Sequence, residues 1–150
     1  MKRKIILGVV VLIIVAASIA AWKYFEKSTN YSTKDPDITV TSKELVEEFN
    51  KDTASANGHF RDKIVRVTGY VKSLDSSAVV LGEEGNTSDV VVGLDERNLK
   101  GVSAMKVGQP VTLQGKFSGY TKSSGNPDDL ISSLGGITIN IDYAGVINKN

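Results

Sequence analysis

The chain has 150 residues, no cysteine, one histidine and a formal net charge of +1. Without cysteine it forms no disulfide, thiolate metal site or cysteine nucleophile, and one histidine is too few for a histidine-rich zinc site. The charge is unevenly distributed: from Thr41 to Asn150, 12 Lys and Arg stand against 14 Asp and Glu, a net of −2. This balance argues against nucleic-acid binding, because nucleic-acid binders carry a basic excess that neutralises phosphates.

The first 22 residues have the pattern of a membrane-targeting segment. Three cations lie in residues 1–4, and residues 5–22 follow as an uncharged, mostly apolar run. As a helix this run would be about 27 Å long, close to the hydrocarbon thickness of a bilayer. Because the cations precede the run, the positive-inside rule keeps residues 1–4 in the cytoplasm. We therefore predict a single-pass signal-anchor helix in the inner (cytoplasmic) membrane, with the C-terminal domain on the periplasmic or extracellular side.

A cleaved signal peptide is the alternative interpretation of this segment. Ser18-Ile19-Ala20 has the small-x-small pattern of a cleavage site. The apolar run is longer than a usual signal core, and bulky Trp22 and Tyr24 lie at its end, which favours an uncleaved anchor. Residues 23–39 are then a polar linker that holds the following domain a short way from the membrane.

The sequence after this linker predicts a helix. Thr41-Ser42-Lys43-Glu44 has the pattern of a capping box, in which a threonine and a glutamate bond each other's amides. Apolar or small residues then recur at spacings of three and four, as on one face of a helix. These residues are Leu45, Phe49, Thr53, Ala56 and Phe60. We expect one helix over this stretch, covering an open end of the domain.

Beyond Lys63 apolar residues alternate with polar ones, as in half-buried strands. The alternation predicts five strands, at 65–72, 78–81, 90–94, 111–120 and 137–143. Residues 96–105, between the third and fourth strands, are expected to be irregular or a short helix. Gly69 and Gly115 lie inside the first and fourth strands, where a closed barrel needs strong curvature.

Three strands, a short connection and two more strands are typical of an OB-fold barrel. We therefore predict a mainly β chain in which residues 40–150 form an extracytoplasmic, five-stranded OB-fold barrel with an N-terminal capping helix. A single transmembrane helix precedes this domain. A sandwich or an α/β sheet fits less well, because helices do not alternate with the strands.

Two segments resemble the tRNA-anti-like family of bacterial OB-fold proteins. The first comprises Asp52, Ala56-Asn57, Phe60, Lys63 and the run Val67–Val71, and the second is the run Gly108–Gly115. The resemblance covers Val40 to Tyr143 and implies an OB-fold and an exported, membrane-linked setting. Two residues depart from the family pattern: Asp62 stands where a glycine is usual, and Phe60 replaces a tyrosine. The resemblance implies little about activity, because fold does not carry function.

OB-folds that bind nucleic acid usually do so on their second and third strands. Here these strands, residues 78–81 and 90–94, carry no aromatic and no basic residue. Stacking contributes about 1–3 kcal/mol per base, so this surface lacks the main driving force for single-strand binding. We therefore expect no nucleic-acid partner.

The first and fourth strands offer another candidate face. They are neighbours in an OB barrel, and their outward positions carry two tyrosines and several cations. If the domain has a ligand face, the predicted residues are Arg66, Tyr70, Lys72, Lys116 and Tyr120, with the loop from Thr121 to Gly136 at its rim. The alternative is an ordinary polar outer surface, on which Lys and Tyr are common.

Two further motifs are better explained by structure than by chemistry. Asn126-Pro127-Asp128-Asp129 suggests calcium, but it fits a helix start better, because the spacing of six or more oxygen ligands is missing. His59 lies near Asp62 but has no recognisable nucleophile to activate. We predict no catalytic residue, no metal and no cofactor.

These features together predict a non-catalytic, membrane-anchored, extracytoplasmic OB-fold module that binds or scaffolds an unknown protein or glycan partner. The first alternative is a nucleic-acid- or nucleotide-binding OB-fold protein, which only fold analogy favours. The second alternative is an enzyme, for which the sequence has no nucleophile–base pair, metal cluster or phosphate-binding loop.

Overall fold

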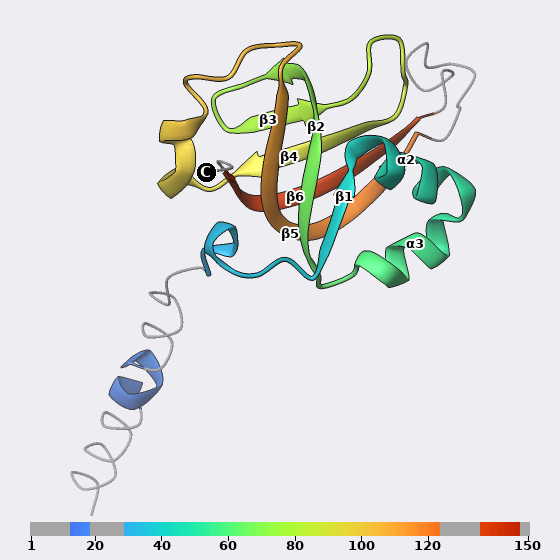
Figure 1. Cartoon of the computed structure of the whole chain (residues 1–150). Coiled ribbons are helices and arrows are strands. Elements are labelled where there is room, and N and C mark those ends of the chain that lie inside the picture. Colours follow the sequence, from blue (N-terminus) through green and yellow to red (C-terminus); the bar gives the residue numbers. More distant parts are fainter. Residues whose placement is uncertain (1–12, 19–28, 124–135, 148–150) are drawn as a thin grey trace, which may run out of the picture.

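The fold is a closed five-stranded β-barrel. The structure, a computed structural model, describes residues 13–18, 29–123 and 136–147. The barrel strands are β2 (Ile64–Leu74), β3 (Ala78–Leu81), β4 (Asp89–Leu94), β5 (Pro110–Lys122) and β6 (Ile137–Val146). They neighbour one another in the order β2-β3-β4-β6-β5, and β5 pairs again with β2 (Figure 1). The prediction of a mainly β, five-stranded barrel is confirmed.

One parallel pairing closes the barrel among otherwise antiparallel barrel strands. β4 runs parallel to β6, with Val90 opposite Ile139, whereas β2 runs antiparallel to both β3 and β5. The predicted alternation on β2 is also confirmed, because Val65, Val67 and Val71 are buried while the residues between them are partly or fully exposed, except Gly69.

A sixth strand lies where the sequence predicted the end of the linker. β1 (Ile38–Thr41) pairs in parallel with β2, with Val40 opposite Val67. Ile38 and Val40 are partly buried against the core, so this segment belongs to the domain. The polar linker predicted for residues 23–39 is therefore shorter than expected.

The residues just before β1 also pack on the barrel. We call residues 30–37 the arm; it contains the short helix η1 (Tyr31–Thr33). The side chain of Gln114 on β5 is fully buried, and its amide nitrogen donates to the carbonyl oxygens of Tyr31 (2.7 Å) and Lys34 (2.6 Å). A buried amide without partners would be costly, so Gln114 and the arm require each other.

The single helix predicted from the sequence is two helices. α2 (Ser42–Lys51) begins at the predicted capping box of Thr41 and Glu44, and α3 (Thr53–Phe60) follows after one residue, Asp52. The carboxylate of Asp52 accepts hydrogen bonds from the amides two and three residues further on, at 3.1 Å each. Asp52 has extended backbone, with φ −156°, so it ends α2 and starts α3.

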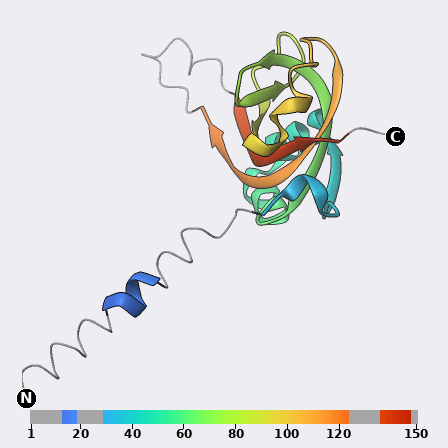
Figure 2. The same cartoon turned by 90° about the vertical axis from the view of Figure 1, so that its left-hand side faces the viewer.

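The two helices close one end of the barrel with aromatic side chains. The ring of Phe49 on α2 lies 5.9 Å from that of Phe60 on α3 and 5.8 Å from that of Phe117 on β5. Figures 1 and 2 show α2 and α3 on one side of the barrel and the short helix η2 (Glu96–Gly101) on the other. The predicted capping role of the N-terminal helical region is therefore confirmed.

The two predicted curvature glycines lie at close approaches of the chain. A Cβ at Gly115 would lie 2.6 Å from the carbonyl oxygen of Asp142 on β6, next to a register shift between β5 and β6. A Cβ at Gly69 would lie 2.3 Å from the side-chain oxygen of Ser42 at the start of α2. Both positions need glycine because neighbouring elements occupy the space of a side chain.

Only part of the predicted membrane segment is described. Residues 13–18 are helical, and the remainder of residues 5–22 lies outside the described part of the chain. Within the residues that the structure describes, no helix is long and apolar enough to cross a membrane.

Candidate binding site around Tyr70

The ladder between β2 and β5 separates the predicted ligand residues. Lys116 lies opposite Ile64 at one end of this ladder, and Tyr70 lies opposite Pro110 at the other. Six residues of strand correspond to about 20 Å. The ammonium group of Lys116 instead lies 3.2 Å from the carboxylate of Asp62. The five predicted residues therefore do not form one site.

Tyr120 points to the opposite side from the one predicted. Its ring packs against Phe49 of the core, with 5.3 Å between the ring centroids. The register of β5 against β6 shifts between Phe117 and Gly119, and Gly119 has φ +142°. Such a bulge adds a residue to one strand and reverses the alternation beyond it. The expectation that Tyr120 lies on the outer face is therefore wrong.

Arg66 is engaged in holding the arm. Its Nε donates to the side-chain oxygen of Gln114 at 2.9 Å, and the amide nitrogen of Gln114 binds the arm. Thr68, two residues along β2, shares a 3.0 Å hydrogen bond with Thr112. The side chains on the outer face of β2 therefore bond to other parts of the protein as far as Thr68. Tyr70 is the first residue of this face that is exposed.

Tyr70 and Lys72 do lie together, in a hollow of about 340 Å³. We call it the Tyr70 hollow; Val71, Gly82, Glu83, Glu84, Val107 and Gly108 complete its lining. Three segments form it: β2, the turn after β3 and the turn before β5. Tyr70 is 58% exposed and Val107 is 62% exposed, so two large side chains with apolar surface face solvent in the same hollow.

Hydrogen bonds fix these three segments to one another. The amide of Val71 donates to the carbonyl of Gln109 (3.0 Å), and the carbonyl of Val71 accepts from the amide of Gly108 (2.8 Å). The amide of Gly82 donates to the carbonyl of Tyr70 (3.1 Å). Gly108 has φ +84°, which suits glycine in this tight turn. The hollow is therefore preformed.

The ammonium group of Lys72 is held by contacts within the fold. Its ammonium nitrogen donates to the two carboxylate oxygens of Asp89, at 2.8 and 2.9 Å, and to the carbonyl oxygen of Asn86 at 2.8 Å. The ionised carboxylate of Asp89 neutralises the charge of this ammonium group. Lys72 therefore joins β2 to the β3–β4 turn and leaves the floor of the hollow without a free cation.

Two carboxylates line the edge of the Tyr70 hollow. Glu83 and Glu84 are both exposed, and within the described residues neither carboxylate takes part in a hydrogen bond or ion pair. Together with the Lys72–Asp89 pair, one cation stands against three carboxylates, a net charge of −2. The hollow therefore combines an apolar surface with an acidic edge.

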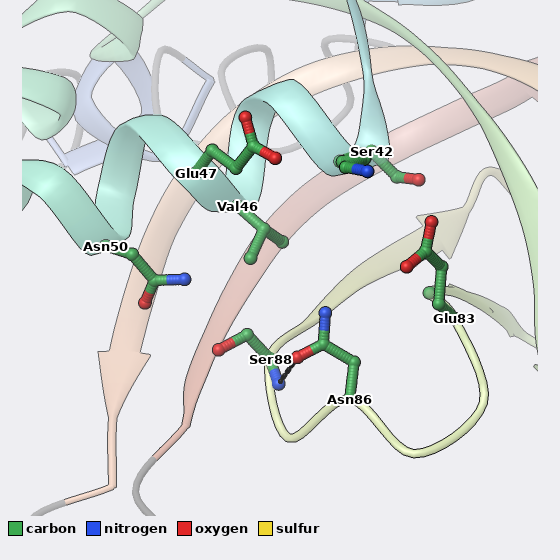
Figure 3. A pocket seen from close by; sticks show the side chains of 9 residues that line it. Ser42, Val46, Glu47, Asn50, Glu83, Asn86 and Ser88 are labelled. Atoms are coloured by element: carbon green, nitrogen blue, oxygen red, sulfur yellow. Dashed lines mark hydrogen bonds between the residues drawn. The ribbon is translucent and has the colours of Figure 1, made fainter.

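A second, smaller hollow of about 100 Å³ borders the same turn after β3. It lies between α2 and the β3–β4 turn, and Gly82 and Glu83 line both hollows. Figure 3 shows Val46 and Asn50 extending from α2 toward the turn residues on the other side. We call this the α2 hollow; Ser42, Lys43, Glu47, Asn86 and Ser88 complete its lining.

Most of the loop predicted at the rim of the site lies outside the described residues, and only its two ends can be placed. The amide of Ile137, just after this loop, donates to the hydroxyl of Ser88 at 3.0 Å. Residues 124–135, which include the Asn126–Asp129 motif, lie outside the described residues. The loop therefore starts and ends at the far end of β5 from Tyr70.

The site is suited to binding. Across the described ranges, no group of three or more His, Asp or Glu side chains is arranged to hold a metal ion. Nδ1 of His59 lies 2.9 Å from a carboxylate oxygen of Glu48, and neither residue lines either hollow. The groups available to a ligand are an exposed phenol ring, an exposed aliphatic side chain and two free carboxylates.

Sequence reasoning missed the contributions of the turns. Val107 and Glu83 lie in two polar turns that are 24 residues apart in the chain and meet only in the fold. One signal was present: Val107 is a lone aliphatic residue in the turn Lys106-Val107-Gly108-Gln109. In the structure Val107 faces solvent, on the Tyr70 hollow.

Comparisons with known proteins agree with this fold. The profile of the tRNA_anti-like family matches residues 1–127. The chain belongs to this family. No curated protein is a significant match. Among solved structures, one similar to this chain is described as a "putative nucleic acid-binding lipoprotein" from Klebsiella pneumoniae subsp. pneumoniae MGH 78578, with a TM-score of 0.50 and 15% identity over 73% of this chain and 92% of that one.

A second solved structure is less similar. It is described as a "putative aspartyl-tRNA synthetase" from Leishmania major Friedlin, with a TM-score of 0.41, 11% identity and coverage of 90% of this chain and 26% of that one. At 15% identity, the similarity to the Klebsiella protein shows the fold alone.

Proposed function

We propose that this tRNA_anti-like protein is a non-catalytic binding module, held at the outer surface of the cytoplasmic membrane by residues 5–22. Its partner, a protein or a glycan, binds in the Tyr70 hollow. The observation that carries the proposal is the exposure of Tyr70 and Val107 over a backbone that is already fixed by hydrogen bonds. A preformed apolar surface loses little conformational entropy when a ligand binds, so it favours affinity.

The arm supports a short connection to the membrane. Because Gln114 binds the backbone of Tyr31 and Lys34, the domain begins near residue 30. Only residues 23–29 then separate it from the proposed membrane helix, and seven extended residues reach at most about 25 Å. A domain this close to the bilayer would meet partners that lie at the membrane surface.

Nucleic-acid binding is the main alternative. It draws support from the family's OB-fold and from the description of the Klebsiella protein. The charges of the site oppose it, since Asp89 neutralises Lys72, and Glu83 and Glu84 would repel phosphate. The strands that usually stack bases, β3 and β4, also carry no aromatic residue.

Site-specific photo-crosslinking in cells tests the proposal. A benzophenone amino acid would replace Val107 in the full-length protein, and in a matched protein it would replace Tyr143, which is 49% exposed but outside both hollows. We expect a discrete cross-linked product from position 107 and none of the same size from position 143. Equal products from both positions, or none from position 107, would contradict the proposal.

A further inference from the structure

We infer that the partner presents a basic polypeptide segment that lies across the Tyr70 hollow and the α2 hollow. An apolar side chain of this segment contacts Tyr70 and Val107, and its lysine or arginine side chains pair with Glu83 and Glu84. The inference rests on the proposed function and specifies the chemical class of the partner.

The charges of the two hollows determine this class. Their ionisable residues are Lys43, Lys72, Glu47, Glu83 and Glu84, and the partner of Lys72 is Asp89. Two cations against four carboxylates leave a net charge of −2. Since Lys72 is neutralised by Asp89, the groups that a ligand meets are mainly carboxylates. Such a surface attracts cations and repels phosphates and acidic chains.

The shape of the surface indicates an extended segment. The two hollows share Gly82 and Glu83, so both border the turn after β3, and a ligand that fills both has to cross this turn. Gly82 presents no side chain to the ligand, and a Cβ there would lie 2.4 Å from a carboxylate oxygen of Asp89. A polypeptide spaces apolar and basic side chains along one chain and can therefore use both hollows at once.

Tyr70 is the residue of the two hollows that is most typical of a polypeptide site. Tyrosine offers a large, rigid contact surface at low entropic cost and is enriched at protein interfaces. Tyr70 can also stack on an arginine plane or face an ammonium group. A neutral glycan would stack on the ring of Tyr70 and donate hydroxyl hydrogen bonds to Glu83 and Glu84, but it would bring no cation to neutralise these two carboxylates.

Selection from a peptide library tests the inference. The full-length protein, held in nanodiscs of neutral phosphatidylcholine so that cations do not adhere to lipid, would be challenged with phage that display random nine-residue peptides. We expect the selected peptides to be enriched in Lys or Arg beside an apolar residue. The Glu83→Gln, Glu84→Gln double variant should weaken their binding at least fivefold, and Tyr70→Ala should weaken it similarly. Glu96→Gln, an exposed glutamate of η2 that lines neither hollow, is the matched control and should leave binding unchanged.

Other results separate the inference from the proposed function. Peptides that need Tyr70 but contain no enriched cation, or that bind the double glutamine variant equally well, would overturn the inference and leave the binding module intact. Tyr70-dependent binding of peptidoglycan fragments without peptide selection would do the same. Salt-sensitive binding of a labelled oligothymidine, or the absence of any binding that depends on Tyr70, would overturn both.

Discussion

The ammonium nitrogen of Lys72 lies 2.8 and 2.9 Å from the two carboxylate oxygens of Asp89. The side chains are only 27% and 23% exposed, so solvent screens this pair less than a surface ion pair. We expect Asp89→Asn to lower the free energy of unfolding by about 1–2 kcal/mol, because Lys72 loses an ionised acceptor. A double-mutant cycle with Lys72→Met, measured by urea unfolding, should give a coupling energy of about 1 kcal/mol. A coupling energy of zero would contradict this role for the pair.

Gln114 is expected to determine whether the arm stays on the barrel. Gln114→Ala removes the donors to the carbonyl oxygens of Tyr31 and Lys34, and we expect it to lower the free energy of unfolding by about 1–3 kcal/mol. Amide hydrogen exchange in the arm should also become faster than in the rest of the domain. Gln109→Ala, at an exposed position, is the control and should leave exchange in the arm unchanged. Unaltered exchange in the Gln114 variant would mean that the arm is held by other contacts.

Gly115 should tolerate no larger residue. We expect Gly115→Val to lower the free energy of unfolding by more than about 1 kcal/mol, because the side chain would overlap the carbonyl oxygen of Asp142 and the Cβ of Ala144. Gly58→Ala is the matched control: it lies in α3, and a Cβ there meets nothing within 4 Å. The control should be neutral or stabilising by up to about 1 kcal/mol, since alanine favours helix over glycine. Equal melting temperatures for the valine variant and the wild type would refute the close approach of β5 and β6.

At Asp62, unlike at the preceding positions, we expect a substitution to stabilise the fold. It follows α3 with φ +62°, a conformation that glycine adopts without strain. We expect Asp62→Gly to raise the free energy of unfolding by about 0.5–1 kcal/mol, less whatever the exposed contact with Lys116 contributes. Asp62→Ala keeps the strain and loses the contact, so it should not be stabilising. If the alanine variant were the more stable of the two, backbone strain at residue 62 would not be the cause.

Local patterns predicted the barrel strands and the start of the helical region. Period-two alternation located β2, and the capping box located the start of α2, because both signals depend on residues close together in the chain. The sequence pattern did not reveal the break at Asp52, because the buried residues before and after it keep the spacing of a single continuous helix. β1 was hidden for another reason: four residues that pair with a strand further along the chain are too few to give a period.

The candidate site depended on contacts that no local pattern contains. The bulge near Gly119 turns Tyr120 inward, and Tyr143, at the end of the predicted last strand, has φ +54° and is 49% exposed. Alternation cannot be extended through such irregularities. The Tyr70 hollow joins turns that are distant in sequence, so only the fold reveals that Val107 and Glu83 lie beside Tyr70.

The central claim, that the Tyr70 hollow holds the partner, is tested most directly by quantitative affinity capture from detergent-solubilised membranes. The full-length wild type, Tyr70→Ser and Tyr143→Ser would each serve as bait, because both tyrosines are exposed and only Tyr70 lines the hollow. We predict that at least one partner captured by the wild type is retained by Tyr143→Ser and depleted at least tenfold by Tyr70→Ser. The same partners at the same abundance on wild type and Tyr70→Ser would contradict the claim.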